Sequence, residues 1–543
     1  MRVLLICDGG GPIGVGHVIR SLALAEAAVA AGHEVKVAGQ FEGSFVQDQL
    51  ASAPVEVTRL PASMAEGGVT PASARGALTE LVQRYEPDLL HVDSYAPVDR
   101  PAGSFVLSNM EDGPFGRRPA DVVVDPTFGA EIAARPDDGS IWLLRGSRFT
   151  PIRQRVLDAR RSAEVVGTMG DSSSSVARSV LVVMGGTDPV GLAPAAVGLL
   201  ARTGLPLDVT VIAVGEDAEQ VHAAAVGSRL SVNVLAPVDD LATVMARQDL
   251  VISAAGSSVW ELCCIGVPMA LIWAVTNQRS GYDRVVAAGA AMGLGGPDLG
   301  VGLGADDLGR GEECVTRLRT ALTDSRVRAD LALAGRRIVD GLGSWRVVRT
   351  WEMAARQRRT GARSAQLPDV ANPGLVARRA TLEDARLLWE WRNDPATRAA
   401  SRHREPVSWP DHLAWLEASL TRSDRKLFMV DDEIGLGPVG TVRWDRAPGF
   451  GDEPEWEVSI AVAPERRGQS LARPLLFVAE VMLTEVAHYE TPPATVTDVT
   501  AYFAVVHVDN LASVRLFEGA GYLPDLPPDP DGFMRFRKLA RVA

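Results

Sequence analysis

The chain has 543 residues with a formal net charge of −13, and 46% of its residues are hydrophobic while 23% are charged. Its length predicts three or four compact units, and its composition is that of a folded protein rather than a disordered one. The negative charge argues against bulk binding to nucleic acid or to an anionic membrane, so an anionic substrate needs local donors. The four cysteines lack metal-ligand spacing, no apolar run reaches about 18 residues, and no signal peptide precedes the first strand. These features predict a cytoplasmic protein without a membrane partner.

The first residues predict a strand, a glycine-rich turn and a helix. Residues 3–7 form an apolar run, and apolar residues recur at helical spacing from Val18 onward. The turn between them holds Gly14, Gly16 and His17. Glycines let backbone N–H groups approach an anion, the helix N-terminus favours negative charge, and imidazole titrates near neutrality. The turn predicts a phosphate site beside a proton-transfer group, and a histidine that caps an ordinary turn is the alternative.

Alternating strands and helices predict two α/β lobes and a third domain. Apolar strand-like runs in the first lobe occur at residues 3–7, 35–38, 89–92, 105–107 and 122–124. We expect this lobe to span residues 1–170, and a second lobe of the same kind to span 176–355 after a serine-rich connector. Ligands of such sheets bind at the carboxyl ends of the strands. Residues 356–375 predict a linker, and residues 376–543, with clustered tryptophans, predict a separate α+β domain.

The second lobe contains two more turns of the strand, glycine turn and helix type. Gly185 and Gly186 follow one apolar strand, and Gly256, Ser257 and Ser258 follow another. Both turns are suited to a phosphate group. Each turn alone is also explained by packing and helix capping.

Three polar side chains near the second turn predict further contacts to a nucleotide. Glu261 lies one helical turn later, where an acidic residue accepts hydrogen bonds from a ribose diol in dinucleotide folds. Asn277 and Gln278 follow the next strand and add amide donors and acceptors. Several such turns, together with His17, are harder to explain by folding needs alone and favour a nucleotide site.

A series of motifs stands in a fixed order in residues 1–355. They are Gly14-Val15-Gly16-His17-Val18-Ile19-Arg20, Val92-Asp93-Ser94-Tyr95, Leu143-Leu144-Arg145-Gly146, Gly185-Gly186-Thr187-Asp188-Pro189, Gly256-Ser257-Ser258 with Glu261, Asn277-Gln278, and Asp340-Gly341-Leu342-Gly343 with Arg346. Together they resemble the UDP-sugar hydrolase family of pseudaminic acid biosynthesis, which has a GT-B-like fold of two Rossmann-like lobes.

This resemblance implies that the second lobe binds UDP and that water attacks the anomeric carbon to release UDP without a metal. It implies His17 and Asp93 as catalytic residues, with His17 as the base or polariser of the water. Nucleotide-sugar contacts are implied at Gly14, Gly16, Arg20, Tyr95, Gly185, Gly186, Gly256, Ser257, Ser258, Glu261, Asn277 and Gln278. The family usually has glycine where Ala255 stands and a pair of aspartates where Glu111-Asp112 stands, which leaves the sugar open.

Two segments of the third domain predict a second anion site. Residues 456–462 alternate like a strand and lead into a basic turn with Arg467 and Gly468, before a helix that runs through residue 479. This arrangement is suited to a pyrophosphate. Further on, Asn510 and Ser513 lie at neighbouring helical positions and can face one ligand, although Asn510 can equally serve as a helix cap.

These two segments resemble the GNAT acetyltransferase family, in which the turn binds the pyrophosphate of acetyl-CoA and an Asn-x-x-Ser helix contacts it. Acetyl-CoA contacts are therefore implied at Val462, Arg467, Gly468, Gln469, Ser470, Ala472, Asn510 and Ser513. Trp391-Arg392-Asn393-Asp394, with His412 and Trp415, resembles the amino-sugar and ribosomal-protein branch of that family.

The sequence departs from the GNAT pattern at two positions. Ser470 replaces a glycine of the turn, and Phe517 stands where many members have a tyrosine acid. Thiolate protonation must then come from water or another group. Glu457 on the strand is the candidate base, or alternatively an exposed strand residue without a role in catalysis.

Together the halves predict a bifunctional nucleotide-sugar enzyme. One half would hydrolyse a UDP-linked acetamido-trideoxy sugar, and the other would N-acetylate a UDP-amino-sugar with acetyl-CoA, as in nonulosonic acid synthesis. Two alternatives remain, a glycosyltransferase with the same nucleotide-sugar site and a nucleotide-sugar binding protein without activity. The sequence does not determine the oligomeric state.

Overall fold

The computed structural model describes residues 1–10, 14–60, 72–95, 100–169, 176–185, 188, 190–296, 305–360, 374–432, 437–448, 455–490 and 501–539. The chain divides into two compact units, Met1–Ala355 and Arg356–Ala543. In the described part of the chain, no helix is long and apolar enough to cross a membrane. The predicted serine-rich connector and most of the predicted linker lie outside the described residues.

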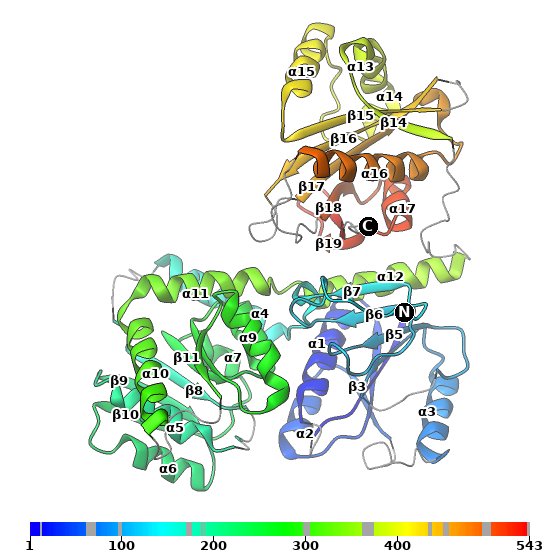
Figure 1. Cartoon of the computed structure of the whole chain (residues 1–543). Coiled ribbons are helices and arrows are strands. Elements are labelled where there is room, and N and C mark those ends of the chain that lie inside the picture. The colour runs from blue at the N-terminus through cyan, green and yellow to red at the C-terminus, as the bar shows by residue number, and fades with distance from the viewer. Residues whose placement is uncertain are drawn as a thin grey trace. The chain divides into compact units, whose positions relative to one another are not determined.

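The first unit begins with a seven-stranded sheet in the order β3-β2-β1-β4-β5-β6-β7, and every pair in it is parallel (Figure 1). Its strands are β1 (Arg2–Cys7), β2 (Glu34–Gly39), β3 (Glu56–Arg59), β4 (Leu89–Asp93), β5 (Val106–Met110), β6 (Val122–Asp125) and β7 (Trp142–Arg145). Its helices are α1 (Gly16–Ala30), α2 (Ser44–Ala51), α3 (Ala72–Tyr85) and α4 (Gln154–Met169), with a 3₁₀ turn at η2 (Ser147–Phe149). The central strands β1, β4 and β5 are almost entirely buried and mostly apolar, because helices cover both faces of such a sheet.

A second sheet of six parallel strands follows in the order β10-β9-β8-β11-β12-β13. Its strands are β8 (Ser179–Val183), β9 (Leu207–Ile212), β10 (Leu230–Leu235), β11 (Leu250–Ala254), β12 (Met269–Ile272) and β13 (Met292–Gly295). Its helices are α5 (Leu192–Arg202), α6 (Glu216–Ala225), α7 (Leu241–Met245), α8 (Ser258–Ile265), α9 (Arg279–Ala287), α10 (Ala305–Thr323) and α11 (Ser325–Ile338), with η3 (Thr276–Gln278) before α9.

Both parallel sheets contain a topological switch point. In the first sheet the chain order reverses between β1 and β4, and in the second it reverses between β8 and β11. The loops that leave two such neighbouring strands run to opposite sides of the sheet and open a crevice at the carboxyl ends. The turns after β1, β4, β8 and β11 are therefore the expected ligand-binding positions of the first unit.

Helix α12 (Gly343–Thr360) follows the second sheet in sequence but packs on the first (Figure 1). The buried Trp351 Nε1 donates to Ser108 Oγ at 2.9 Å, and the same hydroxyl lies 2.9 Å from His91 Nδ1. Burial lowers the pKa of His91 to about 4, so this histidine is neutral at pH 7. The helix thus ties the two parallel sheets into one compact unit.

The second unit is built on a mixed sheet in the order β14-β15-β16-β17-β18-β20-β19, in which the β17–β18 pair is parallel and the other pairs are antiparallel. Its strands are β14 (Leu375–Arg379), β15 (Arg425–Asp432), β16 (Gly437–Ala447), β17 (Glu455–Val462), β18 (Ala501–His507), β19 (Leu523–Leu526) and β20 (Phe533–Leu539). Its helices are α13 (Ala385–Asn393), α14 (Pro395–Ala399), α15 (Trp409–Thr421), α16 (Ala472–Glu490) and α17 (Leu511–Gly519), with η4 (Leu382–Asp384) and η5 (Pro464–Arg466).

Alternate residues of the mixed sheet pack into two separate hydrophobic cores. Phe428 and Val430 of β15 join the core beneath α16, whereas Leu427 and Met429 join the core with α13 and α15. This is the period-two pattern of a strand covered on both faces. Two parallel Rossmann-like sheets followed by a mixed-sheet domain confirm the predicted α/β fold class.

Candidate functional site

The switch point of the first sheet brings His17, Asp93 and Arg20 together. His17 lies in the first turn of α1, just after β1, and Asp93 is the last residue of β4. His17 Nδ1 lies 2.6 Å from Asp93 Oδ1, and Arg20 Nε and Nη2 donate to the two carboxylate oxygens at 2.6 Å each. Both His17 and Asp93 are buried. Three residues predicted from the sequence therefore form one hydrogen-bonded group.

The charges in this group fix how His17 can act. Burial alone would raise the pKa of Asp93, but the Arg20 charge and the hydrogen bonds from Arg20 and His17 outweigh it and hold the pKa well below its ordinary value. The carboxylate therefore accepts a hydrogen bond from His17, which places the imidazole proton on Nδ1. Nε2 is left as the basic nitrogen, and this is the form that a general base needs.

Tyr95 and Asp112 extend the group toward solvent. The Tyr95 ring packs edge-on against His17 with the ring centroids 4.5 Å apart, and its hydroxyl donates to Asp112 Oδ2 at 2.7 Å. Arg20 Nη1 lies 3.7 Å from the same oxygen of Asp112. Tyr95 and Phe115 also line a cavity of about 710 Å³. Asp112 was not predicted as a site residue, and its position two residues after the carboxyl end of β5 is the signal that could have found it.

The first turn of the second sheet is only partly described. Gly185 has a φ of +85° and no atom within 4 Å of the place where a Cβ would stand, so backbone can approach a ligand there. Gly186 lies outside the described residues. Asp188 accepts hydrogen bonds from Leu192 N at 2.9 Å and Ala193 N at 2.8 Å, so its carboxylate already caps α5. A phosphate at this turn would therefore meet Gly185 rather than those two helix amides.

The second turn, after β11, leads into α8 without a side-chain cap. Ser257 is the N-cap of α8 and makes no side-chain capping hydrogen bond. Gln278 Oε1 accepts from Ala274 N at 2.8 Å, and its Nε2 lies 3.6 Å from the place where a Cβ on Gly256 would stand. The turn and the amide thus lie side by side. The side chain of Asn277 lies outside the described residues.

Glu261 lies in the first turn of α8. Burial raises its pKa, against the opposing effect of the Arg155 and Arg153 charges. A partly buried carboxylate at a helix N-terminus is suited to accepting hydrogen bonds from a diol.

Replacing Glu261 by alanine should weaken UDP binding by about tenfold to a hundredfold, because losing a hydrogen bond to a charged group costs about 1.5–3 kcal/mol. Calorimetric titration of the full chain with UDP measures the effect. Glu219 on α6 of the same lobe is exposed, and Glu219→Ala is the matched control that should leave the UDP affinity unchanged. Equal affinities for wild type and Glu261→Ala would remove Glu261 from the nucleotide site.

The mixed sheet of the second unit forks next to Glu457. Strand β17 pairs with β16 along its whole length, whereas its described pairs with β18 are Glu455↔Ala501, Trp456↔Tyr502 and Glu457↔Phe503. Glu457 is the last residue of β17 in that parallel ladder, and Val462 lies further along the strand. Backbone groups of β17 beyond the fork are thus available to an extended ligand.

The turn after β17 contains the predicted pyrophosphate contacts. Gly468 has a φ of +78° with no atom within 4 Å of the place of a Cβ, and the turn leads directly into α16, which begins at Ala472. Gln469 Oε1 accepts from Arg466 Nε at 3.1 Å. Arg467 Nη1 lies 2.8 Å from Asp394 Oδ2, a contact that the sequence did not predict. The turn is thus open at Gly468, and both of its arginines are already in ion pairs, Arg466 with Asp432 and Arg467 with Asp394.

Two further positions bear on the cofactor prediction. Asn510 caps α17, since its Oδ1 accepts from Ser513 N at 3.2 Å, and this leaves the amide Nδ2 for a ligand. Phe517 is buried against Tyr522, whose hydroxyl donates to Glu480 Oε1 at 2.8 Å inside the domain. Tyr522 therefore does not replace the missing tyrosine acid.

Replacing Ser470 by glycine should stabilise the second unit. Ser470 has a φ of +59°, in the left-handed region that costs a residue with a Cβ about 1–2 kcal/mol. Glycine removes this strain but gains freedom in the unfolded chain, so we expect a net gain of about 0.5–1 kcal/mol and a rise in melting temperature of about 1–4 °C. Calorimetric melting measures it. Ser459→Gly, in the extended strand β17, is the control and should lower the melting temperature. A lower melting temperature for Ser470→Gly as well would contradict backbone strain at Ser470.

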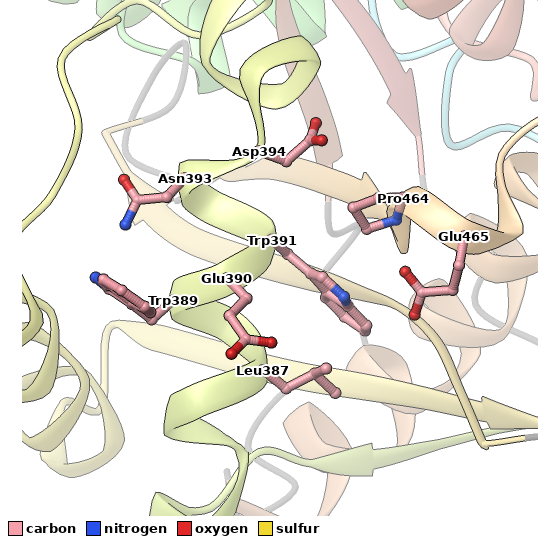
Figure 2. A pocket seen from close by; sticks show the side chains of 8 residues that line it. All are labelled: Leu387, Trp389, Glu390, Trp391, Asn393, Asp394, Pro464 and Glu465. Atoms are coloured by element: carbon pink, nitrogen blue, oxygen red, sulfur yellow. The ribbon is translucent and has the colours of Figure 1, made fainter.

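A cavity of about 420 Å³ lies between α13 and the start of η5. Its lining residues are Leu387, Trp389, Glu390, Trp391, Asn393, Asp394, Pro464 and Glu465. Figure 2 shows Trp391 projecting from α13 toward Pro464, and Asp394 at the end of the helix on that same side. Three carboxylates and two indoles therefore border one space beside the turn that follows β17.

Comparison with known families assigns a class to each half. Residues 375–523 match the family model of the acetyltransferase (GNAT) domain, and residues 180–295 match that of the glycosyltransferase family 28 C-terminal domain. The second unit thus contains a GNAT-like acetyltransferase domain, and the second lobe contains a domain of the glycosyltransferase family 28 type. The predicted pairing of a GT-B-like half with a GNAT half is confirmed at this level.

The chain is also similar to several individual proteins. It is 19% identical to an uncharacterized protein of Methanocaldococcus jannaschii over 458 residues, and this alignment covers 81% of this chain and 83% of that protein. It is 29% identical to the spore coat polysaccharide biosynthesis protein SpsG of Bacillus subtilis over 174 residues, and this alignment covers 31% of this chain and 48% of that protein.

Two solved structures resemble separate parts of the chain. MurG of Acinetobacter baumannii is 17% identical, covers 65% of this chain and 99% of its own, and has a TM-score of 0.45. The spermidine N-acetyltransferase of Vibrio cholerae, solved with CoA and spermine, is 18% identical, covers 31% of this chain and 96% of its own, and has a TM-score of 0.25.

Proposed function

We propose that the chain is a bifunctional nucleotide-sugar enzyme, in which residues 1–355 hydrolyse a UDP-linked acetamido-trideoxy sugar to the free sugar and UDP. The group formed by His17, Asp93 and Arg20 at the switch point of the first sheet carries this proposal. The match of the second lobe to a glycosyltransferase family supports a nucleotide-sugar substrate. The motif resemblance to the pseudaminic acid hydrolase family supports water as the attacking group.

In the proposed reaction, His17 Nε2 removes a proton from water while the water oxygen bonds to the anomeric carbon. The bond from that carbon to the UDP oxygen breaks, and UDP leaves with the electron pair. Asp93 stabilises the imidazolium that forms, and Arg20 keeps Asp93 ionised. The turn after β11, with Gly256 and Ser257, is the proposed phosphate contact. The reaction needs no redox partner.

A glycosyltransferase is the second candidate, and the family 28 match favours it. In that case His17 would activate a hydroxyl of an acceptor rather than water. UDP release from a UDP-sugar, measured without any acceptor, distinguishes the two. Equal amounts of UDP and free reducing sugar support hydrolysis, whereas UDP that forms only when an acceptor is added supports transfer.

For the second unit we propose N-acetylation of the amino group of a UDP-amino-sugar by acetyl-CoA. The GNAT match and the open turn at Gly468 support this. Acetyl-CoA supplies the activated acetyl group. Glu457 at the fork is the proposed base, directly or through a water, and removes the proton of the amine as its nitrogen attacks the thioester carbon. The C–S bond breaks, and the CoA thiolate takes its proton from water, since Phe517 carries none to give.

A further inference from the structure

Arg467, the arginine of the acetyl-CoA turn, is held by the corner between α13 and α14. Its Nη1 lies 2.8 Å from Asp394 Oδ2, and its Nη2 donates to Thr397 Oγ1 at 2.7 Å. The corner and the turn are far apart in sequence, and these two side-chain contacts join them. Asp394 thus occupies the guanidinium that the proposed pyrophosphate site uses.

Asp394 has a fixed position that does not depend on Arg467. It is the N-cap of α14, and its Oδ2 accepts from Thr397 N at 2.9 Å and from Thr397 Oγ1 at 3.2 Å. The backbone hydrogen bond from Thr397, together with the Arg467 charge, lowers the pKa of Asp394. The carboxylate therefore stays ionised and in place when the arginine leaves.

The same carboxylate borders the cavity beside the turn. Glu390, Trp391 and Glu465 line this cavity with Asp394, and none of its lining residues is a lysine or arginine (Figure 2). Its volume of about 420 Å³ lies in the range of small-molecule sites, which is about 300–1,000 Å³. Carboxylates and an indole together favour an organic cation. Pro464 and Glu465 lead along the chain directly into the turn that holds Arg467.

We propose that Asp394 links the binding of the two substrates of the acetyltransferase half. When the pyrophosphate of acetyl-CoA binds Arg467, the Asp394 carboxylate loses its ion-pair partner. The same carboxylate then binds the ammonium group of the acceptor. A guanidinium forms strong paired hydrogen bonds with phosphate oxygens, which lets it exchange one carboxylate for a pyrophosphate. This inference rests on the proposed acetyl-CoA site and adds the form in which the acceptor binds, a protonated amine that releases one proton to water before its nitrogen attacks the thioester carbon. Because coupling between two ligands is reciprocal, the amine tightens acetyl-CoA binding by the same factor.

The variant Asp394→Asn separates the charge of Asp394 from its capping role, because asparagine caps a helix as well as aspartate. Without the ion pair, Arg467 is free for the cofactor, and we expect the full chain to bind acetyl-CoA about two- to fivefold more tightly, the scale of an exposed ion pair. Calorimetric titration measures this. Structural damage to the corner would not tighten acetyl-CoA binding, so a gain in affinity points to the loss of the charge.

Glu417→Gln is the matched control, since it removes a charge from an exposed residue of α15 in the same unit that lines neither the cavity nor the turn. Its acetyl-CoA affinity should equal that of wild type. Unchanged or weaker binding in Asp394→Asn would overturn the inference, as would equal tightening in both variants. If the wild-type chain binds no acetyl-CoA, the proposed function itself fails.

The coupling is tested with glucosamine, an amine, and N-acetylglucosamine, which has the same ring without the charge. Glucosamine should tighten binding of CoA to the wild-type chain, and N-acetylglucosamine should not. The effect of glucosamine should disappear in Asp394→Asn. Equal CoA affinities with and without glucosamine would contradict an ammonium site linked to the turn.

Discussion

Replacing His17 by alanine should abolish UDP release while leaving UDP binding nearly unchanged. The imidazole is oriented by Asp93 in the first lobe, whereas the proposed nucleotide contacts at Gly256, Glu261 and Gln278 lie in the second. A positioned general base contributes about 10²–10⁴-fold to a rate, and we expect turnover to fall by that factor. Turnover and the calorimetric UDP affinity are measured on the same preparation.

His222 gives the control for this experiment. It is exposed on α6 in the second lobe and has no place in the proposed site, so His222→Ala should keep the wild-type rate. Retained turnover in His17→Ala would remove His17 from the mechanism. Loss of UDP affinity together with turnover would instead assign it to nucleotide binding.

Replacing Gly468 by tryptophan should eliminate acetyl-CoA binding. No atom lies within 4 Å of the place where a Cβ would stand on Gly468, so this is the open space beside α16 that the pyrophosphate is proposed to occupy. A bulky side chain fills it. We expect acetyl-CoA affinity to fall below the range that calorimetry detects, and UDP release to continue, because residues 1–355, to which the proposal assigns hydrolysis, form another compact unit.

The variant Gly468→Ala distinguishes the effect of side-chain bulk from the effect of backbone strain at this position. Alanine shares the strain that any side chain meets at a φ of +78°, but it leaves most of the space open. Its acetyl-CoA affinity should fall much less than that of the tryptophan variant. Equal losses in the two variants would mean that the backbone conformation, rather than the space, matters. Unchanged binding in Gly468→Trp would place the cofactor elsewhere.

Local patterns in the sequence were enough to predict much of the fold. The apolar runs at residues 3–7, 89–92 and 122–124 became central strands because a strand covered on both faces needs a continuous apolar run. The short outer strands β3 and β7 were not predicted. Each has only four residues and ends in an arginine, so its periodicity is weak.

The candidate sites show the same division between local and long-range information. His17 was identified from its turn and Asp93 from the motif resemblance, and the parallel pairing of β1 with β4 then places them in contact. The Tyr95–Asp112 hydrogen bond and the Arg467–Asp394 ion pair were not predicted. These contacts depend on strand order and on how loops return to the sheet, which no local pattern encodes.

The most direct test incubates the full chain with a UDP-amino-sugar and acetyl-CoA and follows sugar, nucleotide and CoA by mass spectrometry. The proposed function predicts that UDP, free CoA and a free N-acetylated sugar accumulate, and that leaving out acetyl-CoA prevents acetylation of the sugar. A UDP-sugar that stays intact and unacetylated, while the chain binds both UDP and acetyl-CoA, would contradict a bifunctional enzyme.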